Sequence, residues 1–359
     1  MVLPTLVSFY ILFCTEGKNK LSQVAVGGII LSLSFLTKIV AVFDFAAFSI
    51  TLLALRFFDK KSFESAKIIN EIKSAITGFQ KEAVYAAAFA LPIFIVIVYF
   101  IAVGAFPDFF RAVFSQNVGY VAYGNYFLFP NGLLYFKLFL LLLSILIVTR
   151  YRKAVGREGL IIFIWLAFSM FNAFFSARPY THYLLVLLPP FSLFVGYIFE
   201  KRRQGIFLIP LILILMIIVQ SVFKLNFKRV IPYYINYLSF ITAHKSVQEY
   251  QAFFDRNTPR DYALAQFIRG KTSEADNIFI WGDNAQIYVL SGKLPPGRYT
   301  VSYHISFYKN ATQETQEALL KVRPKYIIQT KEGEEIQNFL DGFELRYKID
   351  NAKIYERQF

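Results

Sequence analysis

The sequence lacks the motifs that mark several large enzyme classes. It has one cysteine, Cys14, which excludes an intramolecular disulfide and a cysteine-based zinc cluster and is best explained as a small apolar filler. It contains no HExxH motif, no phosphate-binding P-loop, no glycine-rich dinucleotide fingerprint and no Gly-x-Ser-x-Gly elbow. These absences argue against a metalloprotease, an ATPase and a serine hydrolase.

Charged residues are also scarce. They make up 17% of the chain, while 56% is hydrophobic and 18% aromatic, and the mean hydropathy is +0.46. This composition is too apolar for a soluble protein of this size. The net charge is +14, but no nucleic-acid recognition motif accompanies it. The basic residues cluster in short segments beside apolar runs, so the charge favours membrane anchoring, and we expect no nucleic-acid partner.

Eight apolar runs dominate the first two thirds of the sequence. Most are continuous rather than alternating, which favours helices over barrel strands. We therefore predict a polytopic α-helical membrane protein with about eight transmembrane segments. The runs are Val2–Phe13, Leu21–Leu36, Ile39–Leu55, Ala83–Val103, Leu133–Val148, Leu160–Phe175, Leu184–Phe199 and Ile206–Phe223.

The basic residues between these runs predict the orientation of the chain. If the eight segments alternate, fifteen Lys and Arg residues lie on one side and only four on the other: Lys38, Arg111, Lys137 and Arg178. The positive-inside rule makes the base-rich side cytoplasmic. We expect a multi-pass protein of the cytoplasmic (inner) membrane, with its C-terminal part outside the cytoplasm and the lipid bilayer as one of its partners.

Two connecting segments have helical patterns of their own. Residues 57–82 mix charges with apolar residues at helical spacing, which indicates a cytoplasmic surface helix or a solvated connector. Residues 104–131 lie in an outer loop, where a short helix near Pro107 and Asp108 would gather several Phe side chains on one face. That face would anchor the loop in the interface or hold a lipid chain.

The character of the sequence changes after Phe223. We divide the chain into a membrane module over residues 1–223, a basic and Tyr-rich interfacial linker over 224–250, and a small extracytoplasmic α/β domain over 251–359. Thr258-Pro259 should open a helix with Thr258 as N-cap. Residues 277–281 and 325–330 read as strands, residues 285–290 and 312–322 as helices, and residues 343–357 as a closing hairpin.

A polar hexapeptide, Arg178, Pro179, Tyr180, Thr181, His182 and Tyr183, separates two apolar runs. Arg178 can hold phosphate through two parallel N–H donors, and His182 can donate to phosphate or carry a proton. Tyr180 and Tyr183 can stack on a sugar or anchor the hairpin. We favour binding of an anionic ligand at the level of the lipid headgroups.

Lys38 lies between two apolar runs with almost no loop. A lysine there should have a partner or reach the interface, so it either contacts a phosphate on the outer face or snorkels from a helix turn. Asp44, six residues further on, is a candidate partner for a base, but that spacing does not favour a direct pair with Lys38. In the tail, Trp281-Gly282-Asp283-Asn284 reads equally well as a strand-end ligand loop or as a turn.

These motifs together resemble bacterial membrane glycosyltransferases of the GT-C type, in the group of protein O-mannosyltransferases and aminoarabinose transferases. The resemblance rests on Leu36-Thr37-Lys38, on the segment from Arg178 to Leu185 with Pro189-Pro190 after it, and on Ile280-Trp281-Gly282-Asp283 with Ile287-Tyr288. It covers nearly the whole chain.

The resemblance implies transfer of a hexosyl or pentosyl group from a polyprenyl-phosphate donor to a glycan, lipid or protein acceptor. A carboxylate would deprotonate the acceptor, and Lys38 and Arg178 would stabilise the departing phosphate. In this family the catalytic acid lies in the first external loop, upstream of the Thr-Lys turn. We therefore expect an N-terminally truncated chain without that acid, since neither Asp44 nor Asp108 matches its position.

The candidate substrate-binding residues are thus Lys38, Arg178, Tyr180, His182 and Tyr183, with the catalytic residue unknown. The sequence indicates no metal site and no definite cofactor, and it leaves a divalent metal at the phosphate open. Two other functions also stay open. One is a transporter or flippase of lipid-linked sugars, which would favour polar groups near the bilayer midplane, and the other is a non-catalytic, membrane-anchored glycan-binding protein.

Overall fold

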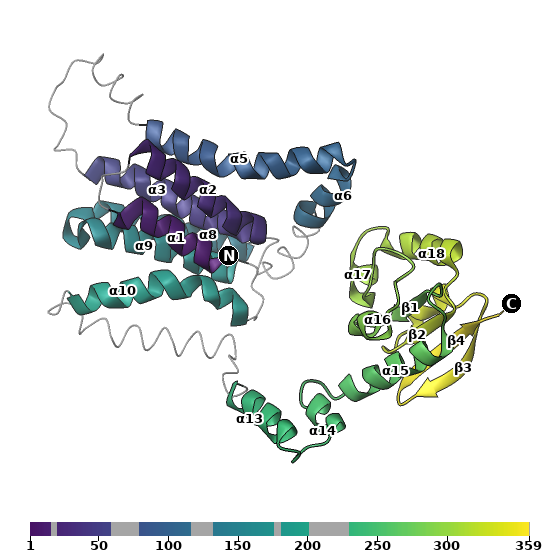
Figure 1. Ribbon diagram of the computed structural model, residues 1–359. Coiled ribbons are helices and arrows are strands. Elements are labelled where there is room, and N and C mark those ends of the chain that lie inside the picture. The colour runs from purple at the N-terminus through teal and green to yellow at the C-terminus, as the bar shows by residue number, and fades with distance from the viewer. Residues whose placement is uncertain (16–19, 59–78, 116–131, 176–180, 201–229, 359) are drawn as a thin grey trace. The chain divides into compact units, whose positions relative to one another are not determined.

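The computed structural model describes residues 1–15, 20–58, 79–115, 132–175, 181–200 and 230–358 (Figure 1). The chain divides into two compact units, residues 1–225 and residues 226–359. The first unit is helical and the second contains a small sheet. The interfacial linker predicted at 224–250 falls mostly at the start of the second unit, and its position at a membrane stays a prediction.

The described residues of the first unit form apolar helices and a few short helical turns. In chain order they are α1 (Val2–Phe9), a π-helical turn η1 (Tyr10–Cys14), α2 (Leu21–Thr37), a 3-10 turn η2 (Ile39–Ala41), α3 (Val42–Phe58), α5 (Gln80–Ala102), α6 (Phe106–Phe110), a π-helical turn η3 (Arg111–Ser115), α8 (Gly132–Arg150), α9 (Arg152–Phe174), a 3-10 helix η4 (Thr181–Leu187) and α10 (Leu188–Glu200).

Five helical stretches of the described residues are long and apolar enough to cross a membrane. They are 39–56, 80–102, 133–150, 152–174 and 182–200, while 2–14 and 21–37 are shorter apolar helices. The predicted helical nature of these seven runs is confirmed. The eighth run, 206–223, and the surface helix predicted at 57–82 fall wholly or largely outside the described residues.

The short outer helix predicted near Pro107 is present as α6, with Pro107 in its first turn. Its aromatic side chains pack on one another and on the preceding span. The ring of Phe109 stacks on Phe100 at 4.3 Å between centroids, and Phe110 lies 5.3 Å from Phe114. These contacts confirm an aromatic cluster, whereas its role at an interface stays a prediction.

The core of the first unit forms around Trp165 of α9. The indole stacks on Phe9 of α1 at 4.4 Å and meets the edge of Phe48 of α3 at 5.3 Å. Trp165 is 1% exposed, so three helices that are distant in sequence share one aromatic centre. Polar contacts join α1 to α2, where Ser8 donates to the carbonyl of Gly27 at 2.8 Å. Such small polar side chains are typical of packed membrane helices.

Helices α2 and α5 approach each other at Gly28. A Cβ atom added there would lie 2.7 Å from the carbonyl oxygen of Tyr85 and 3.1 Å from Ala88 and Phe89. Backbone atoms cannot move aside as a flexible side chain can. The absence of a side chain at Gly28 therefore sets the distance between these two helices.

We predict that Gly28→Val lowers the thermal stability of the detergent-solubilised protein. Overpacking of this kind costs about 1–3 kcal/mol, and a thermal-shift assay followed by size-exclusion chromatography would measure it. Gly196→Val in α10 is the matched control, because no atom lies within 4 Å of the Cβ position there. Equal melting temperatures for the two variants would contradict the close approach.

The second unit begins with two helices, α13 (Val230–Ile241) and α14 (Val247–Ala252), followed by an α/β arrangement. Its further elements are α15 (Thr258–Lys271), β1 (Ile278–Trp281), α16 (Gln286–Ser291), α17 (Ser302–Phe307), α18 (Ala311–Val322), β2 (Tyr326–Gln329), a 3-10 helix η6 (Glu334–Phe339), β3 (Phe343–Ile349) and β4 (Ala352–Arg357).

The four strands form one mixed sheet in the order β1-β2-β4-β3 (Figure 1). β1 and β2 are parallel, and β4 is antiparallel to both β2 and β3. Successive residues of β1 point to opposite faces. Ile278 and Ile280 pack with residues of α15 and α16, whereas Phe279 and Trp281 pack with residues of α17, α18 and η6. Both faces of the parallel pair are thus covered, which explains the continuous apolar strand sequences.

The predicted strands, hairpin and helices of this unit are confirmed, with small corrections. Asn257, not Thr258, is the N-cap of α15, because Pro259 fits the second helical position as well as the first. Helix α17 and the 3-10 helix η6 were not predicted. Both are only six residues long, too short for a periodic pattern to show.

Candidate functional site

Lys38 forms the break between α2 and α3. Its backbone N–H donates to the carbonyl of Ser34 at 2.9 Å and closes α2. Its own backbone is extended, with φ −156° and ψ 119°, and its carbonyl accepts from Ala41 to begin η2. This one extended residue turns the chain between two helices. Lys38 is therefore the turn residue between α2 and η2 and is not part of either helix.

Helix α9 holds the turn in place. The side-chain amide of Asn172 donates to the carbonyl of Val40 at 3.2 Å, and the ring of Phe43 lies 5.3 Å from Phe171. The ammonium group of Lys137 donates to the carbonyl of Phe174 at 2.6 Å. A cation at a helix C-terminus satisfies terminal carbonyls and complements the helix dipole. The first two contacts thus fix the turn and the start of α3 to the end of α9, and the third fixes α8 to the same end.

A pocket of about 410 Å³ opens at this junction. The turn at Lys38, the end of α9, the start of η4 and the turn η3 all contribute to its wall. Its polar side chains include Lys38, Asn172, His182 and Tyr183, and most of the remaining wall is apolar. Its volume is in the range of small-molecule sites, and such sites combine an apolar wall with a few polar groups.

The polar side chains of the pocket are close to one another. The ammonium nitrogen of Lys38 lies 4.5 Å from the centre of the Tyr183 ring, which is cation–π geometry. The rings of His182 and Tyr183 are also 4.5 Å apart, edge to face. The described residues that line the pocket include no Asp or Glu. The wall therefore carries the positive charge of Lys38 without an acidic residue, which suits an anionic ligand.

The structure thus brings together three of the five candidate residues: Lys38, His182 and Tyr183. The other two, Arg178 and Tyr180, lie outside the described residues. Asn172 is a lining residue that the sequence did not single out. Its apolar surroundings, Ser169-Met-Phe-Asn172-Ala-Phe, were a usable signal, because an amide inside an apolar helix needs a partner.

Asp44 does not line this pocket. It is 4% exposed, and its carboxylate accepts a hydrogen bond from the indole N–H of Trp165 at 2.9 Å. It lines an adjacent void of about 10 Å³ that shares Met1 and Val186 with the pocket at Lys38. This is roughly the volume needed for one water molecule. Lys38 and Asp44 therefore have different neighbours, Tyr183 and Trp165.

The second unit has its own candidate loop, residues 281–284, directly after β1. Gly282 is required by close packing, since a Cβ atom there would collide with the Thr330 hydroxyl. The carboxylate of Asp283 accepts from the Ser302 hydroxyl at 2.8 Å and forms an exposed ion pair with Lys331 at 3.6 Å. The loop thus joins the ends of β1 and β2 to the start of α17.

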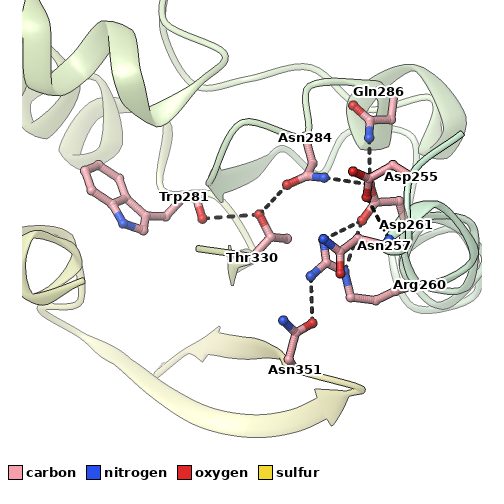
Figure 2. A network of polar contacts seen from close by, with 9 residues as sticks. All are labelled: Asp255, Asn257, Arg260, Asp261, Trp281, Asn284, Gln286, Thr330 and Asn351. Carbon is pink, nitrogen blue, oxygen red and sulfur yellow. Dashed lines mark hydrogen bonds and ion pairs between the residues drawn. The ribbon is translucent and has the colours of Figure 1, made fainter. Parts of the chain in front are cut away.

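Asn284 belongs to a buried network centred on Asp261 (Figure 2). One carboxylate oxygen of Asp261 accepts two N–H groups of Arg260, at 2.8 and 3.1 Å. The other accepts from Asn284 at 2.7 Å and from Gln286 at 2.6 Å. Arg260 also donates to Asn351 in the β3–β4 turn at 2.7 Å.

This network ties α15, the loop after β1, the start of α16 and the hairpin turn together. Arg260 and Asp261 are only 3% and 1% exposed, and both oxygens of Asp261 have donors. A buried pair that is satisfied in this way holds the loop in place. The turn interpretation of residues 281–284 is therefore favoured over the ligand-loop interpretation.

His304 of α17 lies next to the same loop. Partial burial lowers the pKa of His304, and the nearby carboxylate of Asp283 opposes that shift. The ring stacks on Tyr308 at 5.0 Å. Burial of the His304 ring therefore favours its neutral form relative to an exposed histidine.

No group of three or more His, Cys, Asp or Glu side chains in the described part of the chain is arranged to hold a metal ion. The chain matches no protein family model, no curated protein and no solved structure. The resemblance to GT-C glycosyltransferases consequently stays a prediction from the sequence.

We predict that Asp261→Asn destabilises the C-terminal unit by about 3–5 kcal/mol, the usual cost of removing one partner of a buried ion pair. The new amide would leave Arg260 without its anion and would place N–H groups opposite Asn284 or Gln286. Hydrogen exchange of β1 and α15 in the full-length protein would measure the loss. Asp283→Asn is the control, since its exposed pair with Lys331 contributes about 1 kcal/mol or less.

A second prediction concerns His304. Asp283→Asn removes the charge that favours the protonated ring, so the pKa of His304 should fall further below its ordinary value. A pH titration of the His304 ring signals by NMR, with wild type and variant compared at one salt concentration, would show the change. An unchanged or higher pKa in the variant would contradict the electrostatic influence of Asp283.

Proposed function

We propose that this protein is a membrane glycosyltransferase of the GT-C type that uses a polyprenyl-phosphate-linked sugar, and that the pocket at Lys38 binds the phosphate. The main observation in support is that Lys38, His182 and Tyr183 line the same pocket. The described residues that line this pocket include no Asp or Glu. Sequence segments far apart thus supply a cation, an imidazole and an aromatic ring at one place.

The chemistry of such a donor favours a single well-placed cation. A sugar linked to a lipid through one phosphate carries one negative charge, and the phosphate gains a second charge as its bond to the anomeric carbon breaks. A fixed ammonium group therefore interacts more strongly with the leaving group than with the intact donor, which lowers the barrier. Lys38 is the proposed source of this stabilisation, and the His182 ring can contribute an N–H donor.

Arg178 and Tyr180 remain candidate ligands of the same phosphate, because they precede His182 by only a few residues in the sequence. A guanidinium group would add a bidentate contact that Lys38 cannot make. The base that activates the acceptor is assigned to no residue. The sugar and the acceptor are likewise defined only by class.

The location of the pocket also fits the proposed orientation. Between Lys38 and His182 the described residues contain four candidate spans, 39–56, 80–102, 133–150 and 152–174. An even number of crossings returns the chain to the side where it started, which agrees with both residues lining one pocket. Together with the base-rich loops, this supports a pocket on the outer face of the cytoplasmic membrane.

We predict that Lys38→Ala reduces sugar transfer by about 10²–10³-fold, the usual effect of losing one group that stabilises developing negative charge. The assay is transfer of radiolabelled sugar from polyprenyl-phosphate donors by membranes that contain the full-length gene product. Lys38→Arg should keep part of the activity because it keeps the charge. Binding of a photoreactive polyprenyl phosphate should weaken in parallel in the alanine variant.

Lys20→Ala is the matched control, because Lys20 is an exposed lysine at the opposite end of the same helix, α2. It should transfer and bind like wild type. If the folded full-length gene product transfers no sugar from any donor and binds no polyprenyl phosphate, the proposal is wrong. If Lys38→Ala and Lys20→Ala behave alike, the phosphate site lies elsewhere.

Buried Asp44 is the one observation that favours the alternative of transport. An ionisable residue inside an apolar span marks a proton or substrate path in many membrane proteins. Here its hydrogen bond to Trp165 joins two core helices, which gives it a structural role. Counterflow of a labelled lipid-linked sugar in proteoliposomes, lost in Asp44→Asn, would favour a flippase over a transferase.

A further inference from the structure

Helix α13 exposes an apolar stripe. Ile231, Tyr234, Ile235, Leu238 and Ile241 follow one another at intervals of three, one, three and three residues, so they lie on one helical face. Each is more than half exposed, from 54% for Leu238 to 71% for Ile231. Large apolar side chains that are contiguous and exposed mark an interaction surface.

The opposite side of α13 is already occupied by α14. Asn236 is 1% exposed; its amide donates to the carbonyl of Tyr250 at 3.2 Å and its oxygen accepts from Lys245 at 2.8 Å. The ring of Phe240 stacks on Tyr250 at 4.5 Å. These contacts fix the rotation of α13, so the stripe cannot turn toward α14.

The length and composition of α13 identify what covers the stripe. Twelve residues of helix extend about 18 Å, well short of the roughly 30 Å of a bilayer core. The helix contains no Asp, Glu, Lys or Arg, whereas Lys228 and Arg229 precede it and His244 and Lys245 follow it. Tyrosine and flanking bases are typical of the headgroup layer.

We propose that α13 is an interfacial helix that lies parallel to the membrane surface, with the stripe from Ile231 to Ile241 immersed in the outer part of the lipid layer. Only six residues separate the apolar run 206–223 from the start of α13. A membrane span at 206–223 would therefore place the helix close to the bilayer surface. The proposal is independent of sugar transfer, because it needs only a membrane and this helix.

The experiment places a fluorophore on the stripe. In a Cys14→Ala background, Leu238→Cys is labelled with an environment-sensitive dye, and the full-length protein is reconstituted in vesicles of phosphatidylcholine and phosphatidylglycerol. We expect blue-shifted emission, several-fold stronger quenching by lipids with a nitroxide near the headgroup than in the control, and protection from aqueous iodide. Leu320→Cys, on the exposed side of α18 at 72%, is the matched control in the same unit.

Three outcomes are distinguishable. Quenching of position 238 by the lipid nitroxide, with position 320 quenched by iodide, supports the proposal. Equal access of iodide to both positions overturns it, because the stripe then faces water. Protection of position 238 from both quenchers also overturns it, because protein then covers the stripe, and cross-linking would show whether that protein is the first unit or a second copy.

Discussion

The contact between the start of α3 and the end of α9 is the constraint on which the candidate site depends. Asn172 donates to the carbonyl of Val40 and Phe43 packs on Phe171, while Lys137 of α8 binds the terminal carbonyls of α9. Without these contacts the extended residue Lys38 would be a hinge between two helices. With these contacts the turn at Lys38 is fixed, and the ammonium group of Lys38 lies over the Tyr183 ring. Position, more than residue type, makes this lysine a candidate ligand.

Two polar clusters of the chain illustrate how structural and binding roles differ. Around Asp261 each carboxylate oxygen has donors and Arg260 has its anion, so the cluster is electrically balanced and sealed from solvent. Around Lys38 the described pocket wall contains a cation and no acidic residue, and the cavity is open. A buried cluster with balanced charges and satisfied hydrogen bonds stabilises the fold, and it has no remaining donor or acceptor for a ligand. An unbalanced charge in a cavity gains free energy when an anion enters.

Much of the fold could be predicted because the local signals were strong. Continuous apolar runs predicted the helices of the first unit. The apolar segment Ile278–Trp281 before Gly282 predicted a strand, and the two segments on either side of Asp350-Asn351 predicted the hairpin. Lys38 and His182 stood out because a charge and an imidazole between apolar runs are costly without a partner. Their meeting in one pocket could not be predicted, since it depends on how α3 packs against α9. Likewise, Arg260 and Asp261 read as ordinary surface charges of a helix until the sheet covers them.

Helix α13 shows where composition alone misleads. By residue type it resembles a piece of a membrane span, since Val230, Ile231, Ile235, Leu238 and Ile241 would all suit a lipid environment. Length decides against spanning, because backbone groups at the ends of so short a helix would remain unsatisfied inside the hydrocarbon. Asn236 is buried and accepts a hydrogen bond from Lys245, so the side of α13 that carries Asn236 is the side that faces away from lipid. An apolar helix that is too short to cross and is fixed on one side by polar contacts has its lowest free energy at the interface, where its apolar face meets lipid and its ends meet water.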